Sequence, residues 1–430
     1  MNSGSAITKN SNFSGRGVYV DEGGTFDMYG GTISDNRAGN DGGGGVYVAY
    51  GTFTMNGGTI SDNRVTYGYG GGVYVDEGGT FTMNGGNIYD NRVSDGYGGG
   101  VYVDEGGTFT MNGGEISGNT AGGSGGGVFG IFTMYGGTIS GNTAGGSGGG
   151  VCGNFTMSSG TISGNTASSS SSSGGNGGGG VYVDGFSSGQ TWYGGTFTMS
   201  GGEISGNTAS SSSSSSSYGG NGGGGVYVNG GTFTMSDGEI SGNTASSSSS
   251  YGGNGGGVYM YNGTFTMSSG TISGNTAITT TTNGSANSYG GGVYVTNGGT
   301  FTMEGGGTIS GNTAIATTAD NNGYAWSYGG GVYSNGTFTM EDGTISGNTA
   351  ADRGGGVYID SATFTKTGGI ITGYASDTAY GNVVKDDTGT VVNDSGHAVY
   401  VSSSTRRETT AGPSDNLDSS VGGTAGGWEY

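Results

Sequence analysis

The residues that could carry out acid–base chemistry or hold a cation are three Asp-Glu pairs in the first quarter of the sequence. Neighbouring carboxylates can ligate Ca²⁺ or share the acid and base roles of a glycosidase. A glycosidase needs its two carboxylates on opposite sides of a cleft, whereas these pairs recur at one corner of a repeated segment, without an accompanying His or Arg. We therefore expect no catalytic residues, no enzyme activity, no cofactor and no dedicated metal site, with weak Ca²⁺ binding as the alternative. The pairs are Asp21 and Glu22, Asp76 and Glu77, and Asp104 and Glu105.

Aromatic side chains on loops are the second kind of candidate, because exposed rings contact sugars and protein partners. One long insertion carries three of them and a later corner carries two. We predict these five as ligand-binding residues, with a protein or a glycan on a surface as the partner. They are Phe186, Trp192, Tyr193, Tyr324 and Trp326.

Two further columns of side chains face outward in the predicted strands. Tyrosine is the central residue of most Val-Tyr-Val segments, where it either packs on the sheet or offers a flat aromatic surface to sugars or proteins. Thr-Phe-Thr occurs in nine of twelve repeats. This arrangement resembles the threonine faces of β-helical ice-binding proteins, and threonine is also a strong strand former on any solvated face.

All these residues are positioned by one repeated unit, seen most clearly in residues 98–121. Its three short segments alternate between apolar and polar residues, which predicts strands separated by glycine-rich corners. Such a unit cannot bury its apolar side alone, but identical stacked units can. The sequence predicts an all-β fold: a right-handed parallel β-helix (β-solenoid) of about twelve coils, with three short strands per coil and a C-terminal cap. The strands are residues 101–103, 108–111 and 115–117, with Val101, Val103, Phe109, Met111 and Ile116 facing inward.

The spacing within the repeats separates a rigid part from a variable part. The inward phenylalanine and isoleucine are seven residues apart in eleven units and eight apart in one. From that isoleucine to the next valine the distance varies from 12 to 23 residues, and the longer corners contain serine or threonine runs. We interpret these runs as flexible solvated spacers, with O-linked sugar attachment as the alternative. The predicted divisions are a partial N-terminal coil (1–15), the β-helix array (16–372), and a terminal coil, hairpin and C-terminal cap (373–430).

An asparagine stands three residues after the inward isoleucine in eleven units. Its amide can donate to carbonyl oxygens of the adjacent coil and so satisfy polar atoms at a tight corner. We predict a structural ladder rather than a ligand site. Its members are Asn36, Asn63, Asn91, Asn119, Asn142, Asn165, Asn207, Asn243, Asn275, Asn312 and Asn348, and in the twelfth unit Tyr374 is expected at this position.

The composition excludes several classes of partner. The 430 residues include 111 glycines, but apolar residues in fixed register argue for a folded chain. Ten basic residues oppose 31 acidic ones, and no Lys or Arg occurs between Val93 and Asp352, which excludes nucleic acid and disfavours anionic membranes. The single cysteine, Cys152, allows no internal disulfide, and no apolar run predicts a membrane span or a signal peptide.

The two ends of the array differ. Residues 4–10 match the end of a unit, so the sequence begins inside a coil with an unpaired strand edge, which predicts self-association through the N-terminal edge. At the other end Lys366 replaces the inward methionine, and residues 383–392 indicate a hairpin. We expect a C-terminal cap here, with end-to-end assembly into filaments as an alternative.

The segments FTMN at residues 53–56, 81–84 and 109–112, together with the GGGV corners, resemble the FxxN and GGA(I/L/V) repeats of polymorphic outer-membrane proteins and related adhesin-type right-handed parallel β-helix proteins. Residues 396–401 and 406–413 resemble the ends of spirochaete-like bacterial surface repeat proteins. The resemblance implies adhesion and exposure on the bacterial cell surface or outside the cell. We therefore predict a non-enzymatic adhesive or structural rod. The alternatives are an extracellular filament subunit, a glycan-binding module, and an ice-binding protein acting through its Thr-x-Thr columns.

Overall fold

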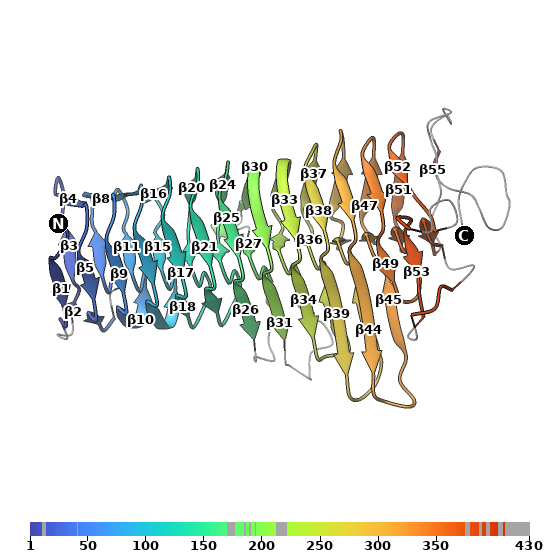
Figure 1. Ribbon diagram of the computed structural model, residues 1–430, viewed down its shortest axis with the longest axis horizontal. Coiled ribbons are helices and arrows are strands. Elements are labelled where there is room, and N and C mark those ends of the chain that lie inside the picture. Colours follow the sequence, from blue (N-terminus) through green and yellow to red (C-terminus); the bar gives the residue numbers. More distant parts are fainter. Residues whose placement is uncertain are drawn as a thin grey trace. The chain divides into compact units, whose positions relative to one another are not determined.

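Each repeat folds into one coil of short parallel strands, as the computed structural model shows (Figure 1). In the fourth repeat, β15 (Val101–Val103), β16 (Thr108–Met111) and β17 (Glu115–Ser117) occupy the predicted segments. A fourth strand, β18 (Thr120–Ala121), follows the ladder asparagine and was not foreseen. All four strands pair in parallel with the matching residues of the next coil. The fold is a right-handed parallel β-helix, as predicted.

The structure describes residues 1–10, 14–40, 42–169, 177–184, 186–188, 191–193, 195–211, 222–374, 379–386, 389–392, 396–402 and 407–408. The chain divides into two compact units, which are described separately. The first unit comprises residues 1–168, 178–183 and 196–207, and the second comprises residues 169–177, 184–195 and 208–430. Each unit contains its own stack of coils.

The first unit contains four columns of strands. Its Val-Tyr-Val column consists of β3 (Val18–Val20), β7 (Val46–Val48), β11 (Val73–Val75), β15, β19 (Val128–Phe129), β23 (Val151–Cys152) and the start of β27 (Val181–Asp184). The Thr-Phe-Thr-Met column consists of β4 (Thr25–Met28), β8 (Thr52–Met55), β12 (Thr80–Met83), β16, β20 (Phe132–Met134), β24 (Phe155–Met157) and the first part of β30 (Thr196–Ser205). The isoleucine column consists of β1 (Ala6–Thr8), β5 (Thr32–Ser34), β9 (Thr59–Ser61), β13 (Asn87–Tyr89), β17, β21 (Thr138–Ser140), β25 (Thr161–Ser163) and the end of β30. The fourth column consists of β2 (Ser14–Gly15), β6 (Arg37–Ala38), β10 (Arg64–Tyr69), β14 (Arg92–Tyr97), β18, β22 (Thr143–Ala144) and β26 (Thr166–Ser169).

The second unit repeats these columns and adds two small sheets. The valine column holds β32 (Val226–Asn229), β36 (Val258–Tyr261), β41 (Val293–Thr296), β46 (Val332–Ser334), β50 (Val357–Ile359) and β54 (Val399–Val401). The phenylalanine and isoleucine columns hold β33 (Thr232–Ser241), β37 (Thr264–Met267), β38 (Thr271–Ser273), β42 (Thr300–Met303), β43 (Thr308–Ser310), β47 (Thr337–Met340), β48 (Thr344–Ser346), β51 (Thr363–Lys366), β52 (Ile370–Ile371) and β55 (Arg407–Glu408). The fourth column holds β31 (Thr208–Ser211), β34 (Thr244–Ser247), β39 (Thr276–Thr281), β44 (Thr313–Thr318), β49 (Thr349–Ala350) and β53 (Val383–Val384). The added sheets are β35 (Tyr251–Asn254), β40 (Ala286–Tyr289) and β45 (Ala325–Tyr328), and the antiparallel pair β28 (Phe186–Ser188) and β29 (Thr191–Tyr193).

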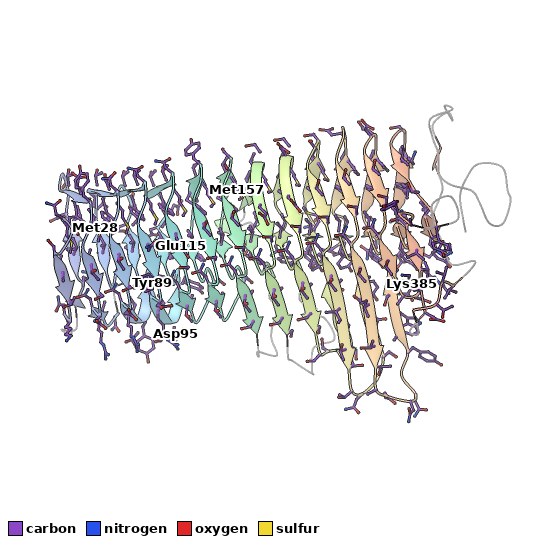
Figure 2. The ribbon with its side chains drawn as sticks, viewed as in Figure 1. Met28, Tyr89, Asp95, Glu115, Met157 and Lys385 are labelled. Atoms are coloured by element: carbon purple, nitrogen blue, oxygen red, sulfur yellow. The ribbon has the colours of Figure 1, made fainter. Side chains whose placement is uncertain are left out.

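The core of each unit is built from columns of identical apolar side chains. Phe81 pairs in register with Phe53 on one side and Phe109 on the other, and their ring centroids are 4.7 and 4.8 Å apart. Met28 and Met157 are completely buried, and Figure 2 marks their positions in the first unit. Because every inward residue rests on its own copy one coil away, neighbouring coils bury what a single coil would expose.

The corner before each ladder asparagine requires a left-handed backbone. Asp90 has a φ of 54° there, and Gly118 has a φ of 64° at the same place one coil later. Asp tolerates this region better than most residues, and Gly adopts it without steric cost. The change from Asp-Asn-Arg in the early coils to Gly-Asn-Thr in the later ones therefore preserves the corner.

The last coils depart from the repeat. Lys366 is buried and pairs with Met340, so it occupies the methionine column as predicted. The expectation that Tyr374 takes the place of the ladder asparagine is wrong, because Asn382 occupies that place after a longer corner and accepts a hydrogen bond from Asn348 Nδ2 at 2.8 Å. In the segment expected to form a hairpin, Lys385 and Val391 form an antiparallel bridge.

Replacing Phe109 with alanine tests the packing of the phenylalanine column. Phe109 is 1% exposed between two stacked rings. We expect Phe109→Ala to lower the free energy of unfolding by about 3–5 kcal/mol, because the neighbouring coils are held by their backbone hydrogen bonds and cannot close the cavity. Urea denaturation measures the loss. Thr110→Ala, on the outer face of the same strand, is the control, and an equal loss in both variants would contradict this assignment of faces.

Candidate functional site

The asparagine ladder uses its amides within the fold. Asn91 Nδ2 donates to Asn119 Oδ1 at 3.0 Å and to the carbonyl oxygen of Ile60 at 2.9 Å, while its own Oδ1 accepts from the backbone N–H of Asn63 at 3.1 Å. All eleven ladder residues are fully buried. Buried amides with both functions engaged hold adjacent corners together and leave no group to meet a ligand.

The outward tyrosine column is largely covered. In the second unit Tyr259, Tyr294, Tyr333 and Tyr358 form a buried cluster, and Tyr289 is among the partly buried rings that pack on it. Of the two interpretations of this column, packing on the sheet applies to these residues. They do not form an open aromatic surface.

In two of the three Asp-Glu pairs the aspartate bonds to the tyrosine column, whereas among the described residues the Asp21 carboxylate accepts only from the backbone N–H of Glu22. Asp104 Oδ1 accepts from the backbone N–H of Glu105 at 2.9 Å, and its Oδ2 accepts from the Tyr74 hydroxyl at 2.8 Å. Asp76 makes the same two contacts with Glu77 and Tyr47. Among the described residues, no group of three His, Cys, Asp or Glu is placed to hold a metal ion. Asp76 and Asp104 therefore each stabilise the turn at the following glutamate and hold one tyrosine ring through its hydroxyl.

The predicted aromatic ligand residues lie in two places in the second unit. Phe186, Trp192 and Tyr193 belong to β28 and β29, whose backbones pair antiparallel with Phe186 opposite Tyr193; their side chains lie outside the described residues. Tyr324 and Trp326 come together before and within β45, with parallel rings 5.3 Å apart. Both of these rings are solvent-exposed.

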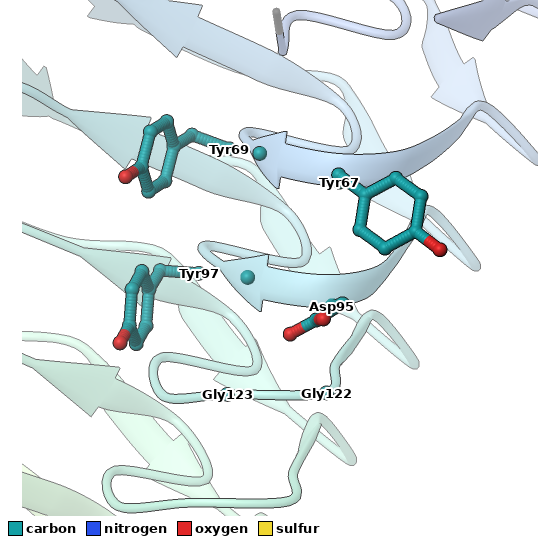
Figure 3. A pocket seen from close by; sticks show the side chains of 8 residues that line it. Tyr67, Tyr69, Asp95, Tyr97, Gly122 and Gly123 are labelled. Atoms are coloured by element: carbon teal, nitrogen blue, oxygen red, sulfur yellow. The ribbon is translucent and has the colours of Figure 1, made fainter. Parts of the chain in front are cut away.

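A pocket of about 340 Å³ lies in the first unit at the ends of β10 and β14 (Figure 3). Its walls carry three tyrosines and one carboxylate, and its remaining lining is glycine backbone. Figure 2 shows the labelled carboxylate, Asp95, near the outer margin of the coils. The lining residues are Tyr67, Gly68, Tyr69, Asp95, Gly96, Tyr97, Gly122 and Gly123.

Unequal strand lengths in neighbouring coils create the pocket. The fourth-column strands β10 and β14 are each six residues long and pair Tyr67 with Asp95 and Tyr69 with Tyr97. In the next coil β18 has only two residues, and the chain continues through Gly122. The longer strands therefore project beyond the following coil and leave a step. The step is the hollow that Figure 3 shows between Asp95 and the Gly122–Gly123 segment.

Glycines keep the floor of the pocket open. A Cβ at Gly96 would collide with the carbonyl oxygen of Gly68, and one at Gly123 would lie 2.8 Å from the Tyr97 ring. The N–H of Gly123 donates to the carbonyl oxygen of Gly96 at 2.8 Å, which fixes the floor against β14. Side chains are excluded from these positions by close approach of the backbone.

The aromatic wall is supported from beneath. The rings of Tyr69 and Tyr97 stack with centroids 5.9 Å apart, and Tyr69 also stacks on Tyr102 at 4.5 Å. Both wall tyrosines remain more than a third exposed. Burial, followed by the nearby charges of Asp104, Tyr69 and Tyr97, raises the pKa of Tyr102 above its ordinary value. The supporting ring thus stays neutral at physiological pH.

The polar groups of the pocket are available to a ligand. Within the described part of the chain, the carboxylate of Asp95 and the hydroxyls of Tyr67, Tyr69 and Tyr97 make no hydrogen bond to the protein. Aromatic faces beside hydrogen-bonding groups suit a ligand with apolar C–H surfaces and hydroxyl edges. One carboxylate without a second across the pocket does not supply an acid and a base.

Sequence reasoning did not identify these pocket residues. From the sequence we interpret the serine and threonine runs of this corner as spacers, and we single out none of the tyrosines at residues 67, 69 and 97. The available signal was that the segments from Arg64 and Arg92 to the next valine carry tyrosines and are one residue longer than the segment that begins at Thr120. Where these segments lie relative to the next coil depends on the register between coils.

The comparisons with known proteins concern the fold. A family model described as a right-handed β-helix region matches residues 1–167 of the chain. Searches of curated proteins and of solved structures gave no significant match. The family match agrees with the observed coils of the first unit.

Tyrosine burial predicts a loss of stability in alkali. Burial, and then the hydrogen bond to Asp104, raises the pKa of Tyr74; burial, and then the charge of Tyr294, raises that of Tyr333. The native state holds these protons more tightly, so their stabilisation is complete below the unfolded-state pKa of about 10 and is lost as the pH rises above it. We expect a fall of up to about 1.4 kcal/mol per pH unit for each such tyrosine.

Denaturant unfolding between about pH 9 and pH 11.5, with tyrosinate absorbance recorded in parallel, measures this dependence. Tyr74→Phe removes one titrating hydroxyl and should make the slope smaller. A free energy of unfolding that stays constant across this range would contradict the prediction.

Proposed function

We propose that this protein is a non-enzymatic adhesive β-solenoid of a bacterial cell surface or the extracellular space, and that its tyrosine pocket binds carbohydrate. The observation that carries the proposal is the pocket itself, where stacked tyrosines, one carboxylate and a glycine floor meet in one hollow. A surface glycan is the proposed partner.

The chemistry of the pocket supports a sugar. Pyranose rings present C–H faces that pack on aromatic rings, and Tyr69 and Tyr97 offer such surfaces. Sugar hydroxyls need acceptors and donors at the ring edge, which Asp95 and the tyrosine hydroxyls supply. A volume of about 340 Å³ lies at the lower end of the range for ligand pockets, which suits the end or a short segment of a glycan.

The carboxylates support binding rather than hydrolysis. Asp95 is the one carboxylate among the residues that line the pocket. Asp76 and Asp104 are bound to tyrosine hydroxyls. Hydrolysis of a glycosidic bond with two carboxylates requires a second group across the substrate.

The predicted location is consistent with the chain's general properties. Its net charge of −21 favours solubility and repels anionic lipid. Among the described residues, no helix is long and apolar enough to cross a membrane. The resemblance to bacterial surface proteins supports the proposed location outside the cell.

Glycan binding and mutation of the pocket wall test the proposal. We expect the protein to bind members of a glycan array, and Tyr97→Ala to weaken that binding at least tenfold in calorimetry, because a stacking surface is lost. Tyr135→Ala is the matched control, since Tyr135 is exposed in the same unit but lies outside the pocket. An equal effect of both changes, or no binding by the wild type, would contradict the proposal.

A second candidate function is ice binding by the second unit. The strands β33, β37, β42, β47 and β51 align two threonine columns without interruption. Neighbouring strands place these threonines about 4.8 Å apart across the sheet and about 7 Å apart along a strand. In the first unit Asp27, Ile131 and Asn154 interrupt the same columns. The regular threonine grid of the second unit is the observation that favours this function.

Thermal hysteresis measures this second function. If the grid binds ice, Thr302→Lys should abolish hysteresis, because a long charged side chain stands in the centre of the flat array. Thr110→Lys, in the interrupted columns of the first unit, should retain it. A wild-type protein without hysteresis or inhibition of ice recrystallisation would remove ice binding from consideration.

A further inference from the structure

The tyrosine pocket has a carboxylate as the one charged side chain in its lining. Three tyrosines, four glycines and Asp95 line it, and no Lys, Arg or His is among them. Asp95 is exposed, and in the described part of the chain its carboxylate has no ion-pair partner. Aromatic faces attract cations through their ring electrons, as a carboxylate does through its charge. The lining therefore favours a ligand with a positively charged group.

The carboxylate and the stacked rings belong to neighbouring positions of the same two strands. Asp95 pairs with Tyr67, and Tyr97 pairs with Tyr69 two residues farther along β14 and β10. Two residues of strand span about 6–7 Å. A sugar ring on the stacked pair can therefore direct a substituent to the carboxylate. Figure 3 shows Tyr69 and Tyr97 together, with Asp95 on the side of Tyr67.

The second unit contains an equivalent corner. Tyr289 and Tyr328 stack there with ring centroids 5.7 Å apart. Each directly precedes the Gly-Gly-Gly-Val segment of its coil, as Tyr69 and Tyr97 do in the first unit. The two stacked pairs thus occupy corresponding places in their units.

The two corners differ in the residue that takes this position in the next coil. In the second unit it is Arg353, whose carbonyl oxygen accepts from the N–H of Gly329 at 3.1 Å. In the first unit it is Ser124, whose carbonyl oxygen accepts from the N–H of Gly98 at 3.1 Å. The shared backbone contact shows that the two positions are equivalent. The first unit therefore has an uncharged residue where the second has a guanidinium group.

The chain's own cations show what such surroundings hold. The Arg353 guanidinium lies 5.0 Å from the centroid of the Tyr400 ring, and its Nε lies 3.9 Å from Asp352 Oδ2. In the first unit, the Arg16 guanidinium lies 4.2 Å from the centroid of the Tyr47 ring. Tyrosine rings outside the core thus take a cation in both units. The pocket offers tyrosines and a carboxylate without a basic residue in its lining.

The pocket also offers more than a single ammonium group requires. Its volume of about 340 Å³ accommodates a small ligand as a whole. The hydroxyls of Tyr67, Tyr69 and Tyr97, which bond to no other described residue, can donate to and accept from sugar hydroxyls. A ligand that combines a positive charge with a ring bearing hydroxyls uses all of these groups.

We propose that the pocket recognises an amino sugar, a hexosamine with a free, protonated amino group, with its ring on Tyr69 and Tyr97 and its ammonium group at Asp95. This inference rests on the proposed function, because it names the kind of glycan that the pocket binds. The ammonium group donates a charge-assisted hydrogen bond to the carboxylate and is attracted to the tyrosine faces. An N-acetylated sugar lacks the charge and gains neither interaction.

Calorimetric titration with three β-1,4-linked tetrasaccharides tests the inference. They differ only at C2 of each sugar, which carries an amino group in the glucosamine probe, an acetamido group in the N-acetylglucosamine probe and a hydroxyl in the glucose probe. In slightly acidic buffer, where the amines are protonated, we expect the wild type to bind the glucosamine probe at least about tenfold more tightly than the other two. Added salt should reduce this preference, because it screens the charges.

Variants of the carboxylate locate the charge recognition. Asp95→Asn keeps the shape of the side chain and should reduce the preference for the glucosamine probe to about twofold or less. Its affinity for the two neutral probes should stay within about twofold of the wild type, which also shows that the variant is folded. Glu115→Gln is the matched control and should retain the preference, since Glu115 is an exposed carboxylate of the same unit outside the pocket. Tyr97→Ala should weaken the binding of all three probes.

The outcomes separate this inference from the proposed function. Equal affinity for the three probes, or a preference that survives Asp95→Asn, overturns the amino-sugar specificity and leaves glycan binding in place. Equal losses of preference in Asp95→Asn and Glu115→Gln overturn it in favour of the general negative charge of the chain. Tighter binding of choline or of a lysine peptide than of the glucosamine probe also overturns it. Absence of binding to every glycan overturns both proposals.

Discussion

The structure depends on stacking identical side chains in register. Asn91 finds its hydrogen-bond partners in Asn63, Asn119 and Ile60, which all belong to adjacent coils. The phenylalanine column is held in the same way, because each ring packs on its own copy. A shift of one residue between coils would leave buried amides without partners and turn the apolar side chains outward. The register is therefore enforced by both polar and apolar groups.

The corners allow the variation that the stacked columns forbid. Before each ladder asparagine the chain needs a left-handed residue, and it uses either Asp or Gly. After the fourth-column strand it tolerates extra residues, because added loop length has little effect on stability. In the second unit such additions form β35, β40 and β45, and Tyr289 of β40 and Tyr328 of β45 pack on the tyrosine column. Long corners thus contribute structure of their own.

A stack of equal coils presents the same surface at each level and defines no particular binding position. The pocket arises where this equality ends, at the change from the six-residue strand β14 to the two-residue strand β18. At the same level Arg92 of β14 pairs with Thr120 of β18. A difference between neighbouring coils therefore gives this one location a shape that the equal coils lack.

The sequence by itself determined the repeating coil, its inward columns and the asparagine positions. Each of these follows from periodicity, because identical residues at fixed spacing can be buried together only if the coils stack in parallel. The tertiary structure alone decided that Tyr333 is covered, that Asn382 continues the ladder, and that Tyr69, Asp95 and Tyr97 enclose a pocket. These features depend on corners that do not repeat. Their paths are set by glycine backbone geometry and by contacts between successive coils, which spacing along the chain does not encode.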